Sequence, residues 1–294
     1  MKMSLDCIPC FVRQAADTVK MSDLSDEEQK RLMQNVLQWI GEFDFNETPP
    51  AVSQSINRRL RSVLPIDDPY RTTKDMHNKM AASLIPSIRQ HLKSSPDPLM
   101  MAVRYAISGN IIDLGSKSNI SHEEIYAALQ NTPLQPIYGD INAFKKAVQK
   151  AKNILYLADN AGEIFFDRLL IEQLSGKKIT VAVRGAPIIN DATIADARAA
   201  KIDDIAEIID NGSDAPGTIL NDCDINFRRR FEEADMVIAK GQGNFETLSD
   251  EQRKIFFLFR IKCPTISCHS GFCVGSYVVA NRFSMPDYVS GAVL

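Results

Sequence analysis

The sequence predicts an α/β fold joined to an all-α part. A helical domain is expected over residues 1–103, and a three-layer α/β/α domain with a mostly parallel sheet over residues 104–294. Helical apolar spacing dominates the first hundred residues, with almost no alternating strand pattern. Short apolar runs then alternate with helical stretches, which is typical of βαβ units. The 294 residues are also enough for roughly two domains of ordinary size.

Capping signals and apolar spacing predict the elements of the helical domain. Ser25 and Glu28 form a capping box ahead of a periodic apolar stretch that Gly41 ends. Similar spacing predicts helices over residues 51–64 and 74–92. Prolines lie between these stretches and close the region: Pro49, Pro50, Pro65, Pro69, Pro96 and Pro98.

Five short apolar runs predict the strands of the α/β domain. They cover residues 153–158, 178–183, 207–209, 235–239 and 263–267. Helices are expected over residues 141–151, 163–174 and 192–200, and another after Ser121. Residues 107–113 fit either a strand or a helix end. The aromatic group Phe256, Phe257 and Phe259 is interpreted as core packing.

Composition and charge exclude several classes of protein. The 34 basic and 37 acidic side chains give a net charge of −3, against the basic excess usual in nucleic-acid binders. No stretch approaches 18 consecutive apolar residues, so no membrane span is expected. The first residues lack the apolar core of a signal peptide. We expect a cytoplasmic protein with neither nucleic-acid nor membrane partners, and the sequence leaves its oligomeric state open.

Small and polar residues follow each of the first four predicted strands. The four loops are Asp159–Glu163, Arg184–Asp191, Asn211–Gly217 and Lys240–Glu246. One such loop is an ordinary turn, because Asn, Asp and Gly are common turn residues. In open parallel sheets, ligands bind beyond the carboxyl ends of the strands, and these four loops share that edge. The sequence therefore predicts one ligand site there.

Oxygen donors in two of these loops predict a metal site. Asp159, Asn160 and Asp191 offer two carboxylates and an amide oxygen. Such hard ligands suit Mg²⁺ or Mn²⁺, which usually contact substrate phosphates directly.

The other residues of the loops favour a phosphate ligand. Gly162 and Glu163 begin a helix, whose first backbone N–H groups form a natural anion site. Lys240, at the end of an apolar strand, is interpreted as a point charge for phosphate. Gly241 allows close backbone approach to a ligand. A glutamate stands where a dinucleotide fingerprint needs its third glycine, and neither a Walker A sequence nor a nucleophile elbow occurs.

Three motifs together resemble the signature of the domain-of-unknown-function 89 family, also called damage-control phosphatases. They read Asp159-Asn160-x-Gly162-Glu163, Arg184-Gly185-x-Pro187-x-x-Asn190-Asp191 and Lys240-Gly241-Gln242-Gly243-Asn244-Phe245-Glu246. The resemblance extends over essentially the whole chain, including Ser108-Gly109-Asn110-x-x-Asp113. The Cys7-x-x-Cys10 pair is similar to the branch found in archaea and bacteria.

This resemblance implies a metal-dependent phosphatase acting on small phosphorylated metabolites, such as sugar phosphates or phosphopantetheine-like compounds. The implied cofactor is a divalent ion: Mn²⁺, Mg²⁺, Co²⁺ or Ni²⁺. The family's metal ligands match Asp159, Asn160 and Asp191, and its phosphate-binding lysine matches Lys240. The expected substrate-binding residues are Asn110, Asp113, Gly162, Glu163, Arg184, Asn190 and Gly241. The implied fold, a helical domain joined to a three-layer domain, agrees with the pattern of elements.

Several roles stay open at this point. Water activated by the metal is favoured as nucleophile over Asp159, because a carboxylate bound to a metal attacks poorly. Asn110 and Asp113 either support the metal ligands or contact substrate. Glu163 either orients a ligand or caps its helix. Ser213 and Asp214 are candidates for substrate choice.

The cysteines offer a second candidate metal site. Cys7-x-x-Cys10 has the spacing of half a zinc site. Its other half would come from Cys268 with either Cys273 or His269, giving a structural Zn²⁺. Two buried thiols or a reversible Cys7–Cys10 disulfide are alternatives. Cys223 is interpreted as a core thiol, and His77, His91 and His122 as surface residues.

Two other functions compete with the phosphatase. One is carboxyl methylation with S-adenosylmethionine, proposed for some relatives. The other is a non-catalytic protein that binds a phosphorylated ligand or a metal. The oxygen-rich set of Asp159, Asn160 and Asp191 favours the phosphatase, because a methyltransferase has no need of it.

Overall fold

The structure, a computed structural model, describes residues 1–109 and 129–282. The predicted site residues Asn110 and Asp113, and the predicted helix after Ser121, lie outside these residues. Across the two described ranges, every helix is too short or too polar to cross a membrane.

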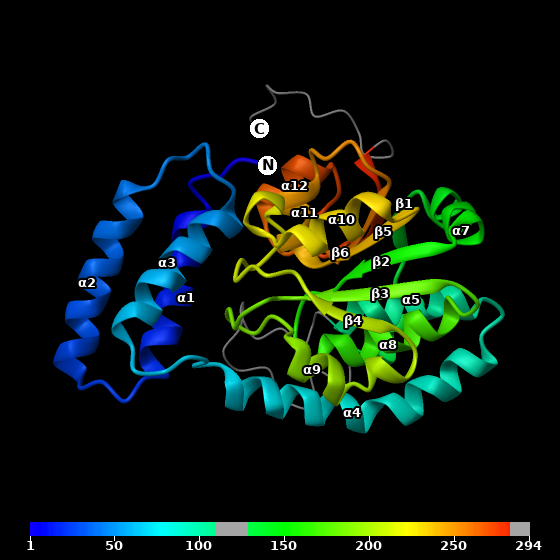
Figure 1. The fold of residues 1–294 in the computed structure, drawn as a ribbon, viewed down its shortest axis with the longest axis horizontal. Coiled ribbons are helices and arrows are strands. Elements are labelled where there is room, and N and C mark those ends of the chain that lie inside the picture. Colours follow the sequence, from blue (N-terminus) through cyan, green and yellow to red (C-terminus); the bar gives the residue numbers. More distant parts are fainter. Residues whose placement is uncertain (110–128, 283–294) are drawn as a thin grey trace.

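The first three helices form a bundle beside the rest of the molecule (Figure 1). Their bounds are α1 Cys7–Lys20, α2 Asp26–Glu42 and α3 Pro49–Val63. The predicted capping box is confirmed, since Ser25 and Glu28 bond reciprocally at the start of α2. The bundle has its own apolar core, in which Val36, Val52 and Ile56 are buried.

The next two helices, α4 (Arg71–Ser94) and α5 (Pro98–Ser108), pack on the sheet instead. Ala81, Ile88 and Val103 belong to the same apolar core as the strands. The core of the bundle and the core that α4 and α5 share with the sheet therefore divide in the connection between α3 and α4. The predicted boundary at residues 103 and 104 does not coincide with a division between cores.

A seven-stranded sheet runs through the rest of the described chain. Its strands are β1 Ile137–Gly139, β2 Asn153–Leu157, β3 Lys178–Val183, β4 Glu207–Asp210, β5 Met236–Lys240, β6 Ile255–Arg260 and β7 Tyr277–Ala280. Their order across the sheet is β1-β7-β6-β5-β2-β3-β4. Strands β2 to β6 are mutually parallel, whereas β7 is antiparallel to β6 and β1 is parallel to β7. Five carboxyl ends thus meet at one edge.

Helices cover both faces of this sheet (Figure 1). One face carries α4 and α5 together with α7 Ile141–Lys150, α8 Glu163–Gln173 and α9 Ile194–Ala199. The other face carries α10 Ile225–Glu233, α11 Gly241–Leu248 and α12 Pro264–Ser270. Alternate residues of β2 serve the two cores: Ile154 and Tyr156 one, Leu155 and Leu157 the other. Helix, sheet and helix layers confirm the predicted fold class.

Four of the five predicted strands match β2 to β5, and the fifth is wrong. Residues 264–270 form α12, which begins at Pro264 after Cys263. The strand that follows β5 in the chain is β6, which contains Phe256, Phe257 and Phe259. It lies between β5 and β7 and is buried on both faces, so it reads as a continuous apolar run without alternation. Ile107 belongs to the end of α5.

Candidate functional site

The loops after β2 and β3 lie against each other at the carboxyl edge of the sheet. Asn160 and Asp191 form an isolated β-bridge. The Ala161 N–H donates to Asn190 O at 2.9 Å, and the Ala192 N–H donates to Asp159 O at 2.8 Å. The structure therefore brings together the three predicted metal ligands Asp159, Asn160 and Asp191, all of them buried.

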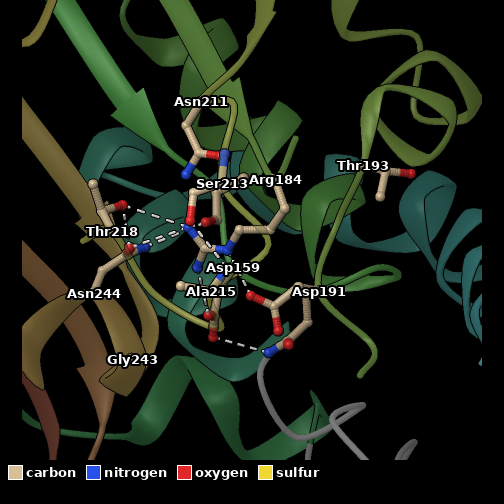
Figure 2. A network of polar contacts seen from close by, with 12 residues as sticks. Asp159, Arg184, Asp191, Thr193, Asn211, Ser213, Ala215, Thr218, Gly243 and Asn244 are labelled. Atoms are coloured by element: carbon tan, nitrogen blue, oxygen red, sulfur yellow. Dashed lines mark hydrogen bonds and ion pairs between the residues drawn. The ribbon is translucent and has the colours of Figure 1, made fainter. Parts of the chain in front are cut away.

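Arg184 directly follows β3. Its side chain lies between the carboxylates of Asp159 and Asp191 and the polar side chains of Asn244 and Thr218 (Figure 2). Its Nε donates to Asp191 Oδ2 at 2.6 Å, and its Nη2 is 3.8 Å from Asp159 Oδ1. Its Nη1 donates to Asn244 Oδ1 at 3.3 Å, and Asn244 in turn accepts from Thr218 Oγ1 at 2.8 Å. The buried guanidinium thus fixes one oxygen of Asp191.

Negative charge is concentrated around Asp159. Burial raises the pKa of this carboxyl well above its usual range, and the charges of Glu163 and Asp191 raise it further. Lys262 and Arg184 oppose this increase only in part. A cation bound between the two aspartates would offset this repulsion, so the charge of the site fits the predicted divalent ion.

Gly241 lies directly against Asp159. Its φ of +77° belongs to the left-handed region, which glycine occupies readily. A Cβ atom at this position would overlap the carboxylate of Asp159. The predicted close approach at Gly241 is therefore to a side chain of the site itself.

Lys240 is fully buried beneath the site. Its ammonium donates to Glu163 Oε1 and Asp167 Oδ1, each at 2.6 Å, and to Ala106 O at 2.8 Å. Burial raises the pKa of Asp167 to about 6 although Lys240 lowers it. All three ammonium donors are used by the protein, so the predicted contact of Lys240 with phosphate would require one of these bonds to break. Its charge instead offsets two buried carboxylates.

Glu163 connects this buried group to the predicted metal ligands. Besides accepting from Lys240, its carboxylate accepts from Asn160 Nδ2 at 3.2 Å, and Asn160 also donates to Asp159 at 2.9 Å. Of the roles left open for Glu163, its contacts agree with orienting Asn160.

The start of α8 differs from the predicted free anion site. The Gly162 N–H donates to Asn78 Oδ1 of α4 at 2.7 Å. Asn78 is itself oriented by donating to Asp196 at 2.9 Å. One helix of the first hundred residues therefore reaches the candidate site.

Of the candidates for substrate choice, Asp214 contacts the helical bundle directly, and Ser213 is linked to it through Asp222. Asp214 accepts from Gln54 Nε2 at 2.7 Å and from Arg58 Nε at 2.9 Å, and it pairs with Arg61. Ser213 Oγ donates to Asp222 at 2.6 Å. Three residues of α3 thus bind the loop that follows β4.

Sequence reasoning missed Lys262 and mistook His77. Lys262 follows β6 at the same carboxyl edge, is partly exposed, and lowers the pKa of Asp159. The wrong assignment of this strand hid its position. His77 is buried, contrary to the surface position expected for it. Its neighbour Asn78 bonds Gly162, a contact that local patterning does not reveal.

The predicted cysteine site is not assembled. Among residues 1–109 and 129–282, no three His, Cys, Asp or Glu side chains are placed to hold a metal ion. Cys7 and Cys10 lie in the first turn of α1, and Ser4 joins this region to α12 through a 2.8 Å contact with Thr265. Cys263, at the start of α12, is the cysteine nearest this contact in sequence. Cys268 and Cys273 are exposed further along.

The fold and site define a class: a three-layer α/β/α protein with a carboxylate-rich site at the strand ends and a helical bundle bound to one of the loops there. The chain belongs to the damage-control phosphatase ARMT1-like domain family, whose model matches residues 3–278.

Individual relatives agree over nearly full length. A damage-control phosphatase of Archaeoglobus fulgidus is 34% identical, over 95% of this chain and 98% of its own. A damage-control phosphatase of Pyrococcus horikoshii is 32% identical, over 97% of this chain and 100% of its own. The crystal structure of a DUF89 family protein from the latter organism matches with a TM-score of 0.88, covering 96% of this chain and 99% of that one.

Proposed function

We propose that the protein is a metal-dependent phosphatase that hydrolyses small phosphorylated metabolites. The observation that carries the proposal is the buried pair Asp159 and Asp191, joined by Asn160 at the carboxyl edge of the sheet. The names of the Archaeoglobus and Pyrococcus relatives support a phosphatase.

Asp159, Asn160 and Asp191 would hold the divalent ion, Mg²⁺ or Mn²⁺ by donor type and Co²⁺ or Ni²⁺ by family resemblance. When bound, the ion supplies Lewis-acid polarisation of a phosphoryl oxygen. Arg184 fixes Asp191 by a 2.6 Å bond, and the Lys240–Glu163 pair orients Asn160. The side chains of Arg184 and Lys240 therefore keep the oxygens of Asp191 and Asn160 in place before substrate arrives.

Lys262 is the cation that we assign to the incoming phosphate. Lys240 and Arg184 are buried among the groups of the site, whereas Lys262 is partly exposed and its charge lowers the pKa of Asp159. A lysine in this position offsets charge on the phosphoryl oxygens. We therefore expect Lys262→Ala to raise KM for phosphate esters, with Lys178→Ala, exposed at the start of β3, as the control.

The first experiment measures phosphate release from p-nitrophenyl phosphate and a panel of sugar phosphates. Metal-stripped protein receives Mg²⁺, Mn²⁺, Co²⁺ or Ni²⁺ separately. Asp191→Asn is expected to abolish metal-dependent release, whereas Asp203→Asn, at an exposed position, retains it. Folded wild-type protein that releases phosphate with none of the four metals would overturn the proposal.

The nucleophile is tested separately. We propose attack by water, as a carboxylate shared with a metal is a weak nucleophile. Borohydride added during turnover converts an aspartyl phosphate to homoserine. Peptide mass spectrometry is expected to find unmodified Asp159, and homoserine at that position would establish covalent catalysis instead.

A further inference from the structure

The turn that precedes Asp191 contains a strained residue. Ile189 has a φ of +44°, within the left-handed region. A β-branched side chain rarely adopts this conformation, and it persists only where the surroundings enforce it. The Asp191 N–H donates to Ile188 O at 3.0 Å, so the strained turn directly orients the backbone of Asp191.

Contacts from the helical bundle and the connection after it hold this turn from outside the sheet. Arg61, on α3, donates from Nη1 to Pro187 O at 2.6 Å. Tyr70, just before α4, forms a small separate apolar cluster with Ile188 and Ile189, all three buried. The Tyr70 hydroxyl lies 3.2 Å from Thr18 Oγ1 on α1, which fixes the ring.

Arg61 is itself fixed on its other side. It pairs with Asp214, whose carboxylate also accepts from Gln54 and Arg58. One guanidinium thus links α3 to the loop after β3 and to the loop after β4. Its neighbour Arg58 shares Asp214 but donates its other bond to Asp222, and Arg59 points to Glu42 and the Trp39 ring.

We propose that Arg61 and Tyr70 are positioning residues that hold the Ile189 turn in its left-handed conformation and thereby place Asp191 for metal binding. The metal-binding part of this inference rests on the proposed function. By linkage, docking of α3 and metal binding then strengthen each other. The helical bundle thus acts as a clamp on the proposed metal site.

Calorimetric titration of metal-stripped, full-length protein with Mn²⁺ alone tests the coupling. Arg61→Ala is expected to weaken Mn²⁺ binding about tenfold, the scale seen when groups that orient metal ligands are removed. Arg59→Ala, on the same helix, is expected to leave the affinity unchanged. Arg58→Ala separates loss of an Asp214 partner from loss of the Pro187 contact, and it is expected to bind Mn²⁺ more tightly than Arg61→Ala.

A rescue variant shows that strain is the cause. Ile189→Gly occupies the left-handed region without steric cost. In the Arg61→Ala background it is expected to recover part of the lost Mn²⁺ affinity. Failure of this double variant to improve on Arg61→Ala would overturn the role assigned to Ile189.

Hydrogen exchange in the absence of metal tests the role of Arg61 independently of the proposed function. Arg61→Ala is expected to speed amide exchange across residues 186–192, while strand β2 exchanges as in the wild type. Unchanged exchange together with wild-type Mn²⁺ affinity would overturn the clamp and leave the phosphatase intact. If the wild type binds no divalent metal, the proposed function fails, and exchange across the turn alone decides whether Arg61 positions it.

Discussion

At the scale of single residues, the close approach of Gly241 to Asp159 leads to a testable prediction. Gly241→Ala forces a left-handed alanine, at about 1–2 kcal/mol, and also displaces the Asp159 carboxylate. Misplacing a group of the site by about 1 Å costs roughly 100-fold in rate. We expect at least that loss in phosphate release and a clear loss of Mn²⁺ affinity, both measured on folded protein.

Gly176→Ala is the matched control for this variant. Gly176 has a similar φ of +82°, but nothing lies within 4 Å of the Cβ it would gain. It therefore carries the backbone cost alone. Equal effects of the two substitutions on metal affinity would show that contact with Asp159 is irrelevant.

Lys240 is expected to matter for stability as much as for activity. Lys240→Met leaves Glu163 and Asp167 buried without their cation, which should lower the free energy of unfolding by about 3–5 kcal/mol. Adding Asp167→Asn should recover part of this loss. Urea denaturation measures both variants, with Lys178→Met, at an exposed position, as control. A loss below about 1 kcal/mol contradicts the proposed electrostatic role.

Sequence reasoning correctly brought together residues that follow neighbouring strands. Asp159 and Asn160 come directly after β2, and Asp191 lies in the loop that follows β3, so predicting the strands also located these proposed ligands. It could not show that Lys240 would be surrounded by Glu163, Asp167 and Ala106, because those partners lie 73 to 134 residues away. Asn78 was missed for the same reason, because its partners Asp196 and Gly162 lie 118 and 84 residues away.

At the scale of elements, α11 carries a carboxyl group with a shifted pKa. Burial raises the pKa of Glu246 to about 7, although the N-terminal ammonium and Lys262 lower it. The folded protein therefore holds this proton more tightly than the unfolded chain. Its contribution to stability is present at low pH and declines as the pH rises from about 4.5 to 7.

Glu246→Gln removes this titration. The variant is expected to match the wild type near pH 5 and to exceed it by about 2 kcal/mol at pH 8, measured by urea denaturation. Glu233→Gln, exposed on α10, controls for the loss of one surface carboxylate. A difference from wild type that is the same at both pH values contradicts the assignment.

The strands between β5 and the β1 edge of the sheet were the hardest to predict. Strands β2 and β3 stand out as apolar runs followed by a polar loop. β6 is also apolar, but no acidic or glycine-rich motif follows it at once, and its aromatic residues suit any buried element. β1 has only three residues and pairs solely with β7, so its existence depends on a partner 140 residues later. No local pattern carries that information.

For the whole molecule, the attachment of the helical bundle can be followed through Trp39, the only tryptophan in the sequence. It lies on α2, a helix that Figure 1 shows away from the sheet. Asp214→Asn weakens the contacts with Arg58 and Arg61, so we expect the Trp39 fluorescence transition to shift to lower urea than the far-ultraviolet circular dichroism transition. In the wild type and in Asp203→Asn the two should coincide. Coincidence in Asp214→Asn as well would show that this network does not couple the cores.

The pairing of distant segments also sets the order of events during synthesis. The bundle core is complete once residue 64 has been made, and it folds from local contacts. Its docking partners Asp214 and Asp222 follow 150 and 158 residues after residue 64, and Thr265, the partner of Ser4, later still. At roughly 5–20 residues per second, the nascent bundle waits on the order of ten seconds with its arginines facing solvent. The proposed clamp on Asp191 therefore closes only after most of the chain has left the ribosome.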